Sequence, residues 1–150
     1  MDKNKISYGN ENDTNLKLLI SLSRSVSGIN RETMRNIKEY GLTPSQFMVL
    51  EVLYHKGEMR VCDITEKILS TGGNMTVVIS NLLKENYIEK KNTPGDRRSY
   101  SVSLTEKGRK IISEIFPLHL LTISAAMKNI EEDEKLELIR LLRKMQGLDT

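Results

Sequence analysis

A basic segment holds the residues whose chemistry is clearest. Between Lys84 and Lys110 the sequence has eight Lys or Arg and four Asp or Glu, a net charge of +4, whereas the whole chain of 150 residues nets +3. Clustered positive charge attracts phosphate groups. Arg97 and Arg98 follow Pro94-Gly95, a pair that favours a tight turn. The segment predicts a phosphate-binding surface, with a solvated charged surface as the alternative.

A second set of candidate residues shares one face of a helix predicted over residues 74–84. This outward face carries Asn74, Thr76, Val77, Ser80, Asn81 and Lys84, and the opposite stripe is apolar. Short polar side chains read base edges in duplex DNA, whereas Lys, Arg and helix N-termini hold phosphates. Thr71, Gly72 and Gly73 lie in the preceding turn, where glycines would let a phosphate approach closely. The alternative is that the glycines only form the turn.

These side chains must be positioned by a helix, a turn, a second helix and a two-stranded hairpin with a basic loop. The sequence places these elements at 61–69, 70–73, 74–84, 87–91 and 100–104, with the loop at 92–98. Residues 59–61 would add a short third strand. This order is typical of a helix-turn-helix with a basic wing, which binds duplex DNA.

The wing supplies three of the candidate contacts, and Lys90 on its first strand supplies a fourth. An Arg at a protruding tip can enter the minor groove of DNA, where the potential is most negative. Asp96 flanks Arg97 and lies two residues before Arg98, so its carboxylate can orient an arginine. The alternative is a solvated hairpin turn that is basic by chance.

Capping signals mark the other helices. A long first helix should begin near Asp13 or Thr14 and end at Gly41 in the left-handed conformation. Thr43, followed by Pro44 and Gln46, is a strong start signal for a central, buried helix. Further helices should begin after Thr105 and after Asn129 or Glu131. The first helix and the last two are too apolar for the surface of one molecule, so we expect a symmetric dimer.

Composition narrows the class of protein. Hydrophobic residues make up 38% and charged residues 29%, values ordinary for a soluble globular protein. The sequence has no apolar run near the roughly 18 residues of a membrane span, and its polar first residues do not form a signal peptide. A single cysteine suits a reducing compartment. We therefore expect a cytoplasmic protein of one domain with no membrane association.

Residues for catalysis or metal binding are sparse. His55 and His119 lie in different predicted helices, and the sequence lacks a Gly-rich phosphate loop, an HExxH and a CxxC motif. We expect no enzyme activity, no cofactor and no metal site. Cys62 lies at a helix start, where the helix dipole can activate a thiol for redox sensing. We expect instead a buried, inert Cys62, because free cysteines are among the most buried residues.

The hairpin and the helix after it carry a recognisable signature. Asp96-Arg97-Arg98 and the later Leu104-Thr105-Glu106-Lys107-Gly108 follow the spacing Asp-x-Arg-x5-Leu-Thr-x-x-Gly. This spacing resembles the wing signature of the MarR family of winged-helix repressors. Asn86-Tyr87-Ile88 stands where that family usually has Gly followed by two apolar residues. The likeness covers nearly the whole chain, and implies a single MarR-type unit over 1–150, with a DNA-binding lobe at 42–104 and dimerisation helices at 13–41 and 105–147.

The resemblance also implies function. It implies an obligate dimer and a ligand pocket between the dimer helices and the DNA-binding lobe. It also implies DNA contacts from the second motif helix and the wing, with Arg98 in the minor groove and Asp96 as its partner. Tyr40, Phe47, Tyr54 and His119 are the candidate pocket residues. Our hypothesis is a homodimeric repressor on a pseudo-palindromic operator, released by a small phenolic or amphipathic effector. The alternatives are a redox sensor through Cys62 and a winged-helix protein-interaction module that binds no DNA.

Overall fold

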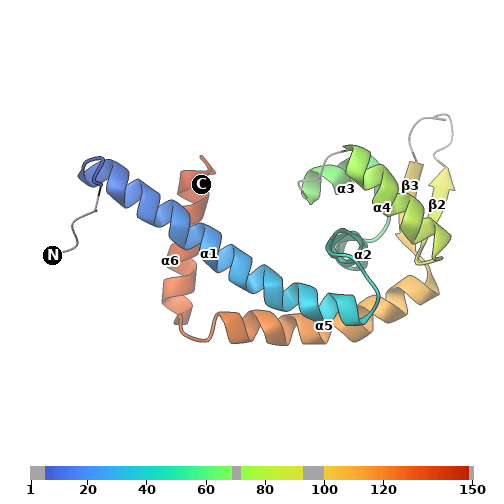
Figure 1. Ribbon diagram of the computed structural model, residues 1–150. Coiled ribbons are helices and arrows are strands. Elements are labelled where there is room, and N and C mark those ends of the chain that lie inside the picture. The colour runs from blue at the N-terminus through green and yellow to red at the C-terminus, as the bar shows by residue number, and fades with distance from the viewer. Residues whose placement is uncertain (1–5, 69–71, 93–99, 149–150) are drawn as a thin grey trace.

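The chain forms six helices and three short strands within the residues described by a computed structural model, 6–68, 72–92 and 100–148 (Figure 1). In chain order these elements are α1 (Asn10–Glu39), α2 (Pro44–Lys56), β1 (Met59–Arg60), α3 (Val61–Lys67), α4 (Gly72–Lys84), β2 (Ile88–Asn92), β3 (Tyr100–Leu104), α5 (Glu106–Ala126) and α6 (Glu132–Met145). The predicted class, mainly α with a small winged sheet, is confirmed. Within the described ranges, no helix has the length and apolar character needed to cross a bilayer.

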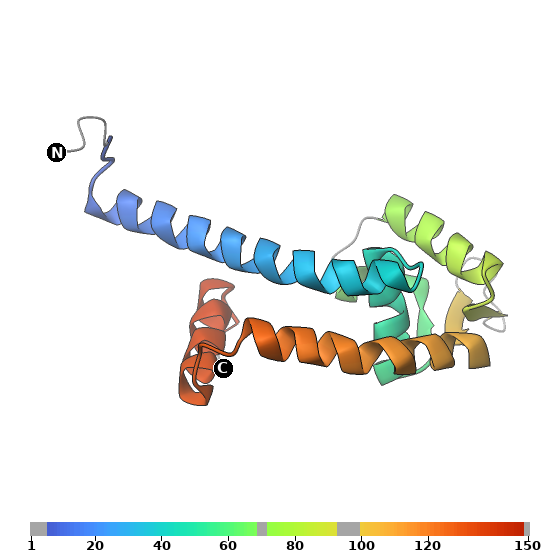
Figure 2. The same cartoon turned by 60° about the horizontal axis from the view of Figure 1, so that its bottom comes forward.

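Two regions are distinct in the ribbon. Helices α2, α3 and α4 gather with the sheet at one end, and we call this region, residues 42–104, the lobe (Figure 1). Helix α5 runs from the lobe alongside α1 and leads to α6 (Figure 2). We call α1, α5 and α6 the helical extension. The N-terminal end of α1 and helix α6 both lie at the side of the molecule away from the lobe.

The predicted caps account for the helix boundaries on either side of the lobe. Thr43 Oγ1 accepts a bond from the Gln46 backbone N–H (3.2 Å), and Gln46 Oε1 accepts one from the Thr43 N–H (2.8 Å). This capping box, with Pro44 in the first turn, confirms the predicted start of α2. Gly41, with φ of +73°, follows the end of α1, and Thr105 Oγ1 accepts from the Gly108 N–H (3.0 Å) to begin α5.

Two predicted boundaries were wrong. Helix α1 begins at Asn10 rather than Asp13 or Thr14, because the Asp13 carboxylate accepts bonds from the Ser7 hydroxyl (2.6 Å) and the Tyr8 N–H (2.9 Å), which lie before the helix. Helix α4 begins at Gly72, so Gly72 and Gly73 belong to its first turn rather than to the turn before it.

The sheet has the strand order β1-β3-β2 and is antiparallel throughout. Val102 on the central strand pairs with Lys90 on one side and with Met59 on the other. Residues paired across a sheet point to the same face, so Lys90 shares the face of Val102, which is fully buried. Lys91, its neighbour in sequence, points to the opposite, solvent-exposed face.

One hydrophobic core holds the lobe together. Its buried members are Ile37, Leu42, Phe47, Val49, Leu50, Leu53, Ile64, Met75, Val78, Ile79, Leu82, Ile88, Val102, Ile112 and Ile115. The helical extension contributes only the C-terminal end of α1 and the N-terminal half of α5 to it, and α6 has no buried residue at all. The core of the lobe is therefore built mostly from its own residues, with Ile37, Ile112 and Ile115 added from the adjoining ends of α1 and α5.

Candidate nucleic-acid interface

Helix α4 presents the predicted outward face to solvent. Asn74, Thr76, Val77, Ser80, Asn81 and Lys84 are all exposed. On the opposite side Val78, Ile79 and Leu82 are buried together with Met75, a core residue that the sequence prediction missed. Val77 is 58% exposed and lies among the polar side chains of this face. This helix is anchored by one side and leaves a mixed polar and apolar surface for contact.

The two adjacent lysines of β2 have different surroundings. Lys90 Nζ lies 3.9 Å from the centre of the Tyr100 ring, a cation–π contact on the sheet face that meets the lobe. Lys91 Nζ is 3.0 Å from Glu58 Oε2 on the other face, and Glu58 also accepts a hydrogen bond from the Ser101 hydroxyl. The Ser101 hydroxyl, and then Lys91, lower the pKa of Glu58 below its usual 4.5. Among the described residues, Lys90 is exposed and forms no ion pair with a carboxylate, whereas Lys91 is paired with Glu58.

Several predicted contacts cannot be placed. Thr71, Asp96, Arg97 and Arg98 lie outside the described residues. Strands β2 and β3, which flank positions 93–99, are paired in register up to Asn92 and Tyr100, so the predicted hairpin itself is present. Gly72 and Gly73 lie in the first turn of α4, where backbone N–H groups have no partner within the helix.

Three of the four predicted effector residues meet in one aromatic cluster. The Phe47 ring lies 5.0 Å from the His119 ring, and Tyr54 lies 6.4 Å from Phe116, which in turn is 6.0 Å from His119. Phe116 and His55 complete the cluster, with their ring centres 4.7 Å apart. Phe116 and His55 were not predicted as members of the cluster, because their proximity depends on how α2 crosses α5. Tyr40, the fourth candidate, is partly buried against the same core.

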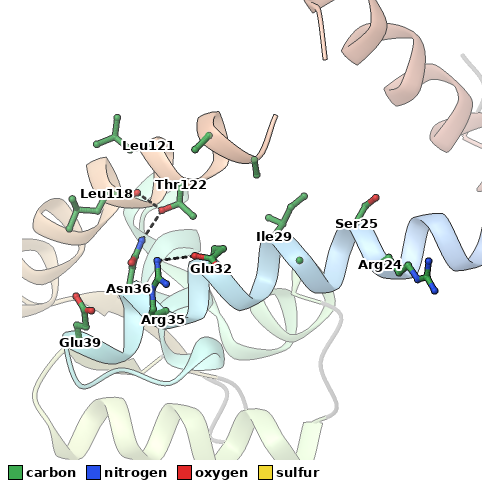
Figure 3. A pocket seen from close by; sticks show the side chains of 13 residues that line it. Arg24, Ser25, Ile29, Glu32, Arg35, Asn36, Glu39, Leu118, Leu121 and Thr122 are labelled. Atoms are coloured by element: carbon green, nitrogen blue, oxygen red, sulfur yellow. Dashed lines mark hydrogen bonds and ion pairs between the residues drawn. The ribbon is translucent and has the colours of Figure 1, made fainter. Parts of the chain in front are cut away.

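A cavity of about 750 Å³ lies between α1 and α5 (Figure 3). Ile29, Leu118 and Leu121 give it an apolar lining, and Arg24 and Arg35 stand along its α1 side. The Asn36 amide donates a hydrogen bond to Thr122 Oγ1 (2.7 Å) and ties the two helices together at its floor. None of the four predicted effector residues lines this cavity, which opens on the helical extension rather than in the lobe.

Cys62 is exposed, so the expectation that it is buried was wrong. It lies in the first turn of α3, where Ile64 occupies the buried position instead. Its Sγ is 3.4 Å from Asp63 Oδ1, and Asp63 also forms an ion pair of 3.0 Å with Arg60. That pair is the main reason why the pKa of Asp63 is lowered. Among the described residues, no group of three His, Cys, Asp or Glu side chains is placed to hold a metal ion.

Comparisons with known proteins agree with this geometry. Residues 34–115 match the family model described as "Transcriptional regulator SarA/Rot". The HTH-type transcriptional regulator MhqR of Bacillus subtilis is 36% identical over 137 residues, which cover 91% of this chain and 94% of MhqR. The chain belongs to the MarR and SarA/Rot family of transcriptional regulators. As a member of this family it is a DNA-binding regulator and not an enzyme.

Solved structures of MarR-family proteins share the fold. A C80S mutant of Escherichia coli MarR in complex with operator DNA superposes with a TM-score of 0.80 at 20% identity, covering 91% of this chain and 99% of that one. Bordetella bronchiseptica BpsR, whose DNA binding is regulated by 6-hydroxynicotinic acid, has a TM-score of 0.78 at 25% identity, covering 87% of this chain and 98% of that one. The likeness therefore extends over the lobe and the helical extension together.

Proposed function

We propose that this MarR-family chain acts as a homodimeric repressor on a pseudo-palindromic operator and is released from DNA by a small phenolic or amphipathic effector. The observation that supports it best is the contrast between a self-contained lobe, with an exposed α4, and an extension whose apolar face lacks cover in the single chain. A reading helix and an unfilled dimer surface are the two parts that such a repressor needs.

A second copy of this chain is the proposed cover for the extension. Its exposed large apolar side chains include Leu16, Leu18, Leu19, Ile20 and Val26 on α1, Leu118, Leu120 and Leu121 on α5, and Leu136, Leu138, Ile139, Leu141 and Met145 on α6. Soluble monomers seldom expose apolar patches of more than a few hundred Å². A twofold axis would bring identical patches together, and would set two α4 helices roughly 34 Å apart, one turn of DNA.

Each lobe would then contact one half-site. We assign base reading in the major groove to the exposed short side chains of α4, above all Asn74, Ser80 and Asn81. Lys84 and Lys90 would contact phosphates, as would the backbone at Gly72 and Gly73. On the basis of the family resemblance, we assign Arg98 to the adjoining minor groove with Asp96 as its partner.

The effector site is proposed at the aromatic cluster with Tyr40. Flat rings of Phe47, Tyr54 and His119 suit an aromatic ligand. His119 Nδ1 is buried and has no hydrogen-bond partner among the described residues, so a ligand hydroxyl would satisfy it. Release from DNA requires that the ligand bind more tightly to one spacing of the two lobes than to the other.

The test begins with duplexes enriched from a random-sequence pool by binding to this protein. We expect a pseudo-palindromic consensus and, by light scattering, two chains on each duplex. Fluorescence anisotropy over a salt series should give an affinity that falls steeply with salt, because each phosphate contact contributes a log–log slope of about −0.9. A strictly monomeric protein, or an enriched pool without a consensus, contradicts the proposal and favours a protein-interaction module.

The lysine pair of β2 provides a matched control. Lys90→Ala should weaken binding and reduce the salt slope by about one contact, because its ammonium group is proposed to meet a phosphate. Lys91→Ala removes the same charge from the face that carries Glu58, and should leave the slope unchanged. If the two variants changed the affinity and the salt slope equally, the face of the sheet that carries Lys90 would not be part of the DNA interface.

Exposure of Cys62 keeps thiol sensing as a second candidate. The thiol is accessible, but its Sγ lies 3.4 Å from the Asp63 carboxylate, whereas reactive cysteines lie in positively charged surroundings. We therefore expect Cys62→Ser to respond to peroxide as the unmodified protein does. Loss of peroxide-induced DNA release in that variant would establish the thiol as the sensor.

A further inference from the structure

The end of α4 is clamped to the start of α5 through three successive backbone carbonyls. The carbonyl oxygen of Glu85 accepts a bond from Lys107 Nζ (2.6 Å), that of Asn86 from the Thr105 hydroxyl (2.8 Å), and that of Tyr87 from the Thr105 N–H (3.1 Å). Glu85 directly follows the last residue of α4, where carbonyls have no partner within the helix and are normally satisfied by outside donors, and Asn86 and Tyr87 form the turn after it. Here the donors all come from the first turn of α5 or its cap.

Side-chain packing tightens the same junction. Lys107 Nζ lies 4.3 Å from the centre of the Tyr87 ring, so its charge meets both an aromatic face and the negative end of α4. A Cβ atom added at Gly108 would come within 1.9 Å of the Tyr87 carbonyl oxygen. Only glycine permits this approach, and Asn86 completes the turn with φ of +59°. The Leu-Thr-x-x-Gly run of the sequence thus builds a contact between two helices.

The junction joins the reading helix to the helical extension. From Thr105, α5 runs about 31 Å over its 21 residues, and near its other end Thr122 accepts the bond from Asn36 of α1 (Figure 2). A change in the tilt of α5 therefore reaches α4 directly at Glu85–Tyr87.

We propose that Lys107 is a positioning residue for operator binding. It acts through the carbonyl of Glu85 and the ring of Tyr87 to fix the orientation of α4 relative to α5. This inference rests on the proposed role of α4 as the reading helix. Lys107 touches no DNA in this scheme, which separates it from a lysine that binds a phosphate.

The experiment compares Lys107→Met, Lys107→Arg and, as control, Lys110→Met, which removes a charge from an exposed position one turn further along α5. Binding to the enriched duplex is measured by anisotropy over a salt series. We expect Lys107→Met to bind roughly fivefold more weakly at every salt concentration, with an unchanged slope. Arginine can donate to the same carbonyl and stack on the same ring, so Lys107→Arg should bind within about twofold of the unmodified protein.

Hydrogen exchange in the free protein supplies a readout that needs no DNA. The Tyr87 N–H bonds to the Leu82 carbonyl (2.9 Å), and we expect it and the Thr105 N–H to exchange faster in Lys107→Met but not in Lys110→Met. Unchanged affinity and unchanged exchange in Lys107→Met would overturn the proposal. A salt slope reduced by about 0.9 in that variant would also overturn it, because it would show that Lys107 contacts a phosphate. If the unmodified protein bound no duplex, the proposed function would fail, whereas the exchange data would still report on the clamp.

Discussion

The lobe and the helical extension are built from similar amounts of apolar sequence, but they use it differently. In the lobe, Leu50, Leu53, Ile79 and Val102 are each at most 1% exposed. In the extension, Leu19, Leu121 and Leu136 are each at least 60% exposed. A hydrophobic stripe on a helix therefore does not by itself indicate a core within the same chain. The apolar side chains of the lobe are mostly buried, whereas many of those of the extension are exposed in the single chain.

The largest effect is expected from a cavity in the lobe. Leu50→Ala removes a fully buried side chain of α2 and should lower the free energy of unfolding by about 2–5 kcal/mol. Urea denaturation followed by circular dichroism measures this loss. The same truncation at Leu136 on α6, which is 62% exposed, should leave the free energy of unfolding of the monomer almost unchanged. Equal losses of unfolding free energy at Leu50 and Leu136 would contradict the difference in packing between the lobe and the extension.

The next prediction concerns association. Leu121→Glu places a charge on the exposed apolar face of α5, where a second copy is proposed to pack, and burying an unpaired charge there is strongly unfavourable. We expect a monomer by light scattering, with an intact lobe by circular dichroism. Glu114→Gln, an exposed position nearer the lobe on the same helix, should remain dimeric. A dimeric Leu121→Glu would place the interface elsewhere.

A smaller effect is expected at the wing. Arg98→Ala should weaken operator binding by about 1–3 kcal/mol without changing the oligomeric state, since it removes one minor-groove contact for each lobe. Arg140→Ala, on α6 in an ion pair with Glu137, is the matched control and should leave operator affinity unaltered. Anisotropy titrations of the two variants decide whether DNA affinity belongs to the lobe alone.

The smallest effect is a pH dependence. Ser101 and Lys91 lower the folded-state pKa of Glu58, so its stabilising contribution is present above the unfolded value of 4.5 and is lost as the pH falls through the lower folded value. Glu58 links β1 to the other strands, whereas Glu137, whose pKa Arg140 also lowers, forms only a local pair within α6. Urea midpoints below about pH 5 should therefore flatten more in Glu58→Gln than in Glu137→Gln. The reverse order would contradict the assignment of these bonds to the lobe's stability.

Sequence signals between neighbouring residues were sufficient to predict most of the helices and their starts. Thr43, Pro44 and Gln46 predicted the start of α2, and Thr105 predicted that of α5, because each of these signals depends on residues at most a few positions apart. The helical periodicity of residues 74–84 likewise placed the exposed face of α4. Boundaries failed where a side chain bonded outside its helix, as Asp13 does.

The candidate site was predictable only in part, because much of it depends on contacts between distant segments. Lys90 and Lys91 look alike in the sequence, and only strand register and Glu58 separate their roles. The ring of Phe116 joins the aromatic cluster through the crossing of α2 and α5. Lys107 was noticed only as one charge among eight, since its partners, Glu85 and Tyr87, lie some twenty residues earlier.

The length of α1 determines how far a rotation of this helix displaces the lobe. Thirty helical residues make a rod of about 45 Å that begins far from the lobe and ends against it. With its far end held by a second copy, a pivot of about 6° swings the lobe by roughly 5 Å. That displacement exceeds the rise of about 3.4 Å between neighbouring base pairs. Under the proposed function, a small rotation of α1 at the dimer surface would therefore move one lobe relative to its half-site by more than one base-pair step.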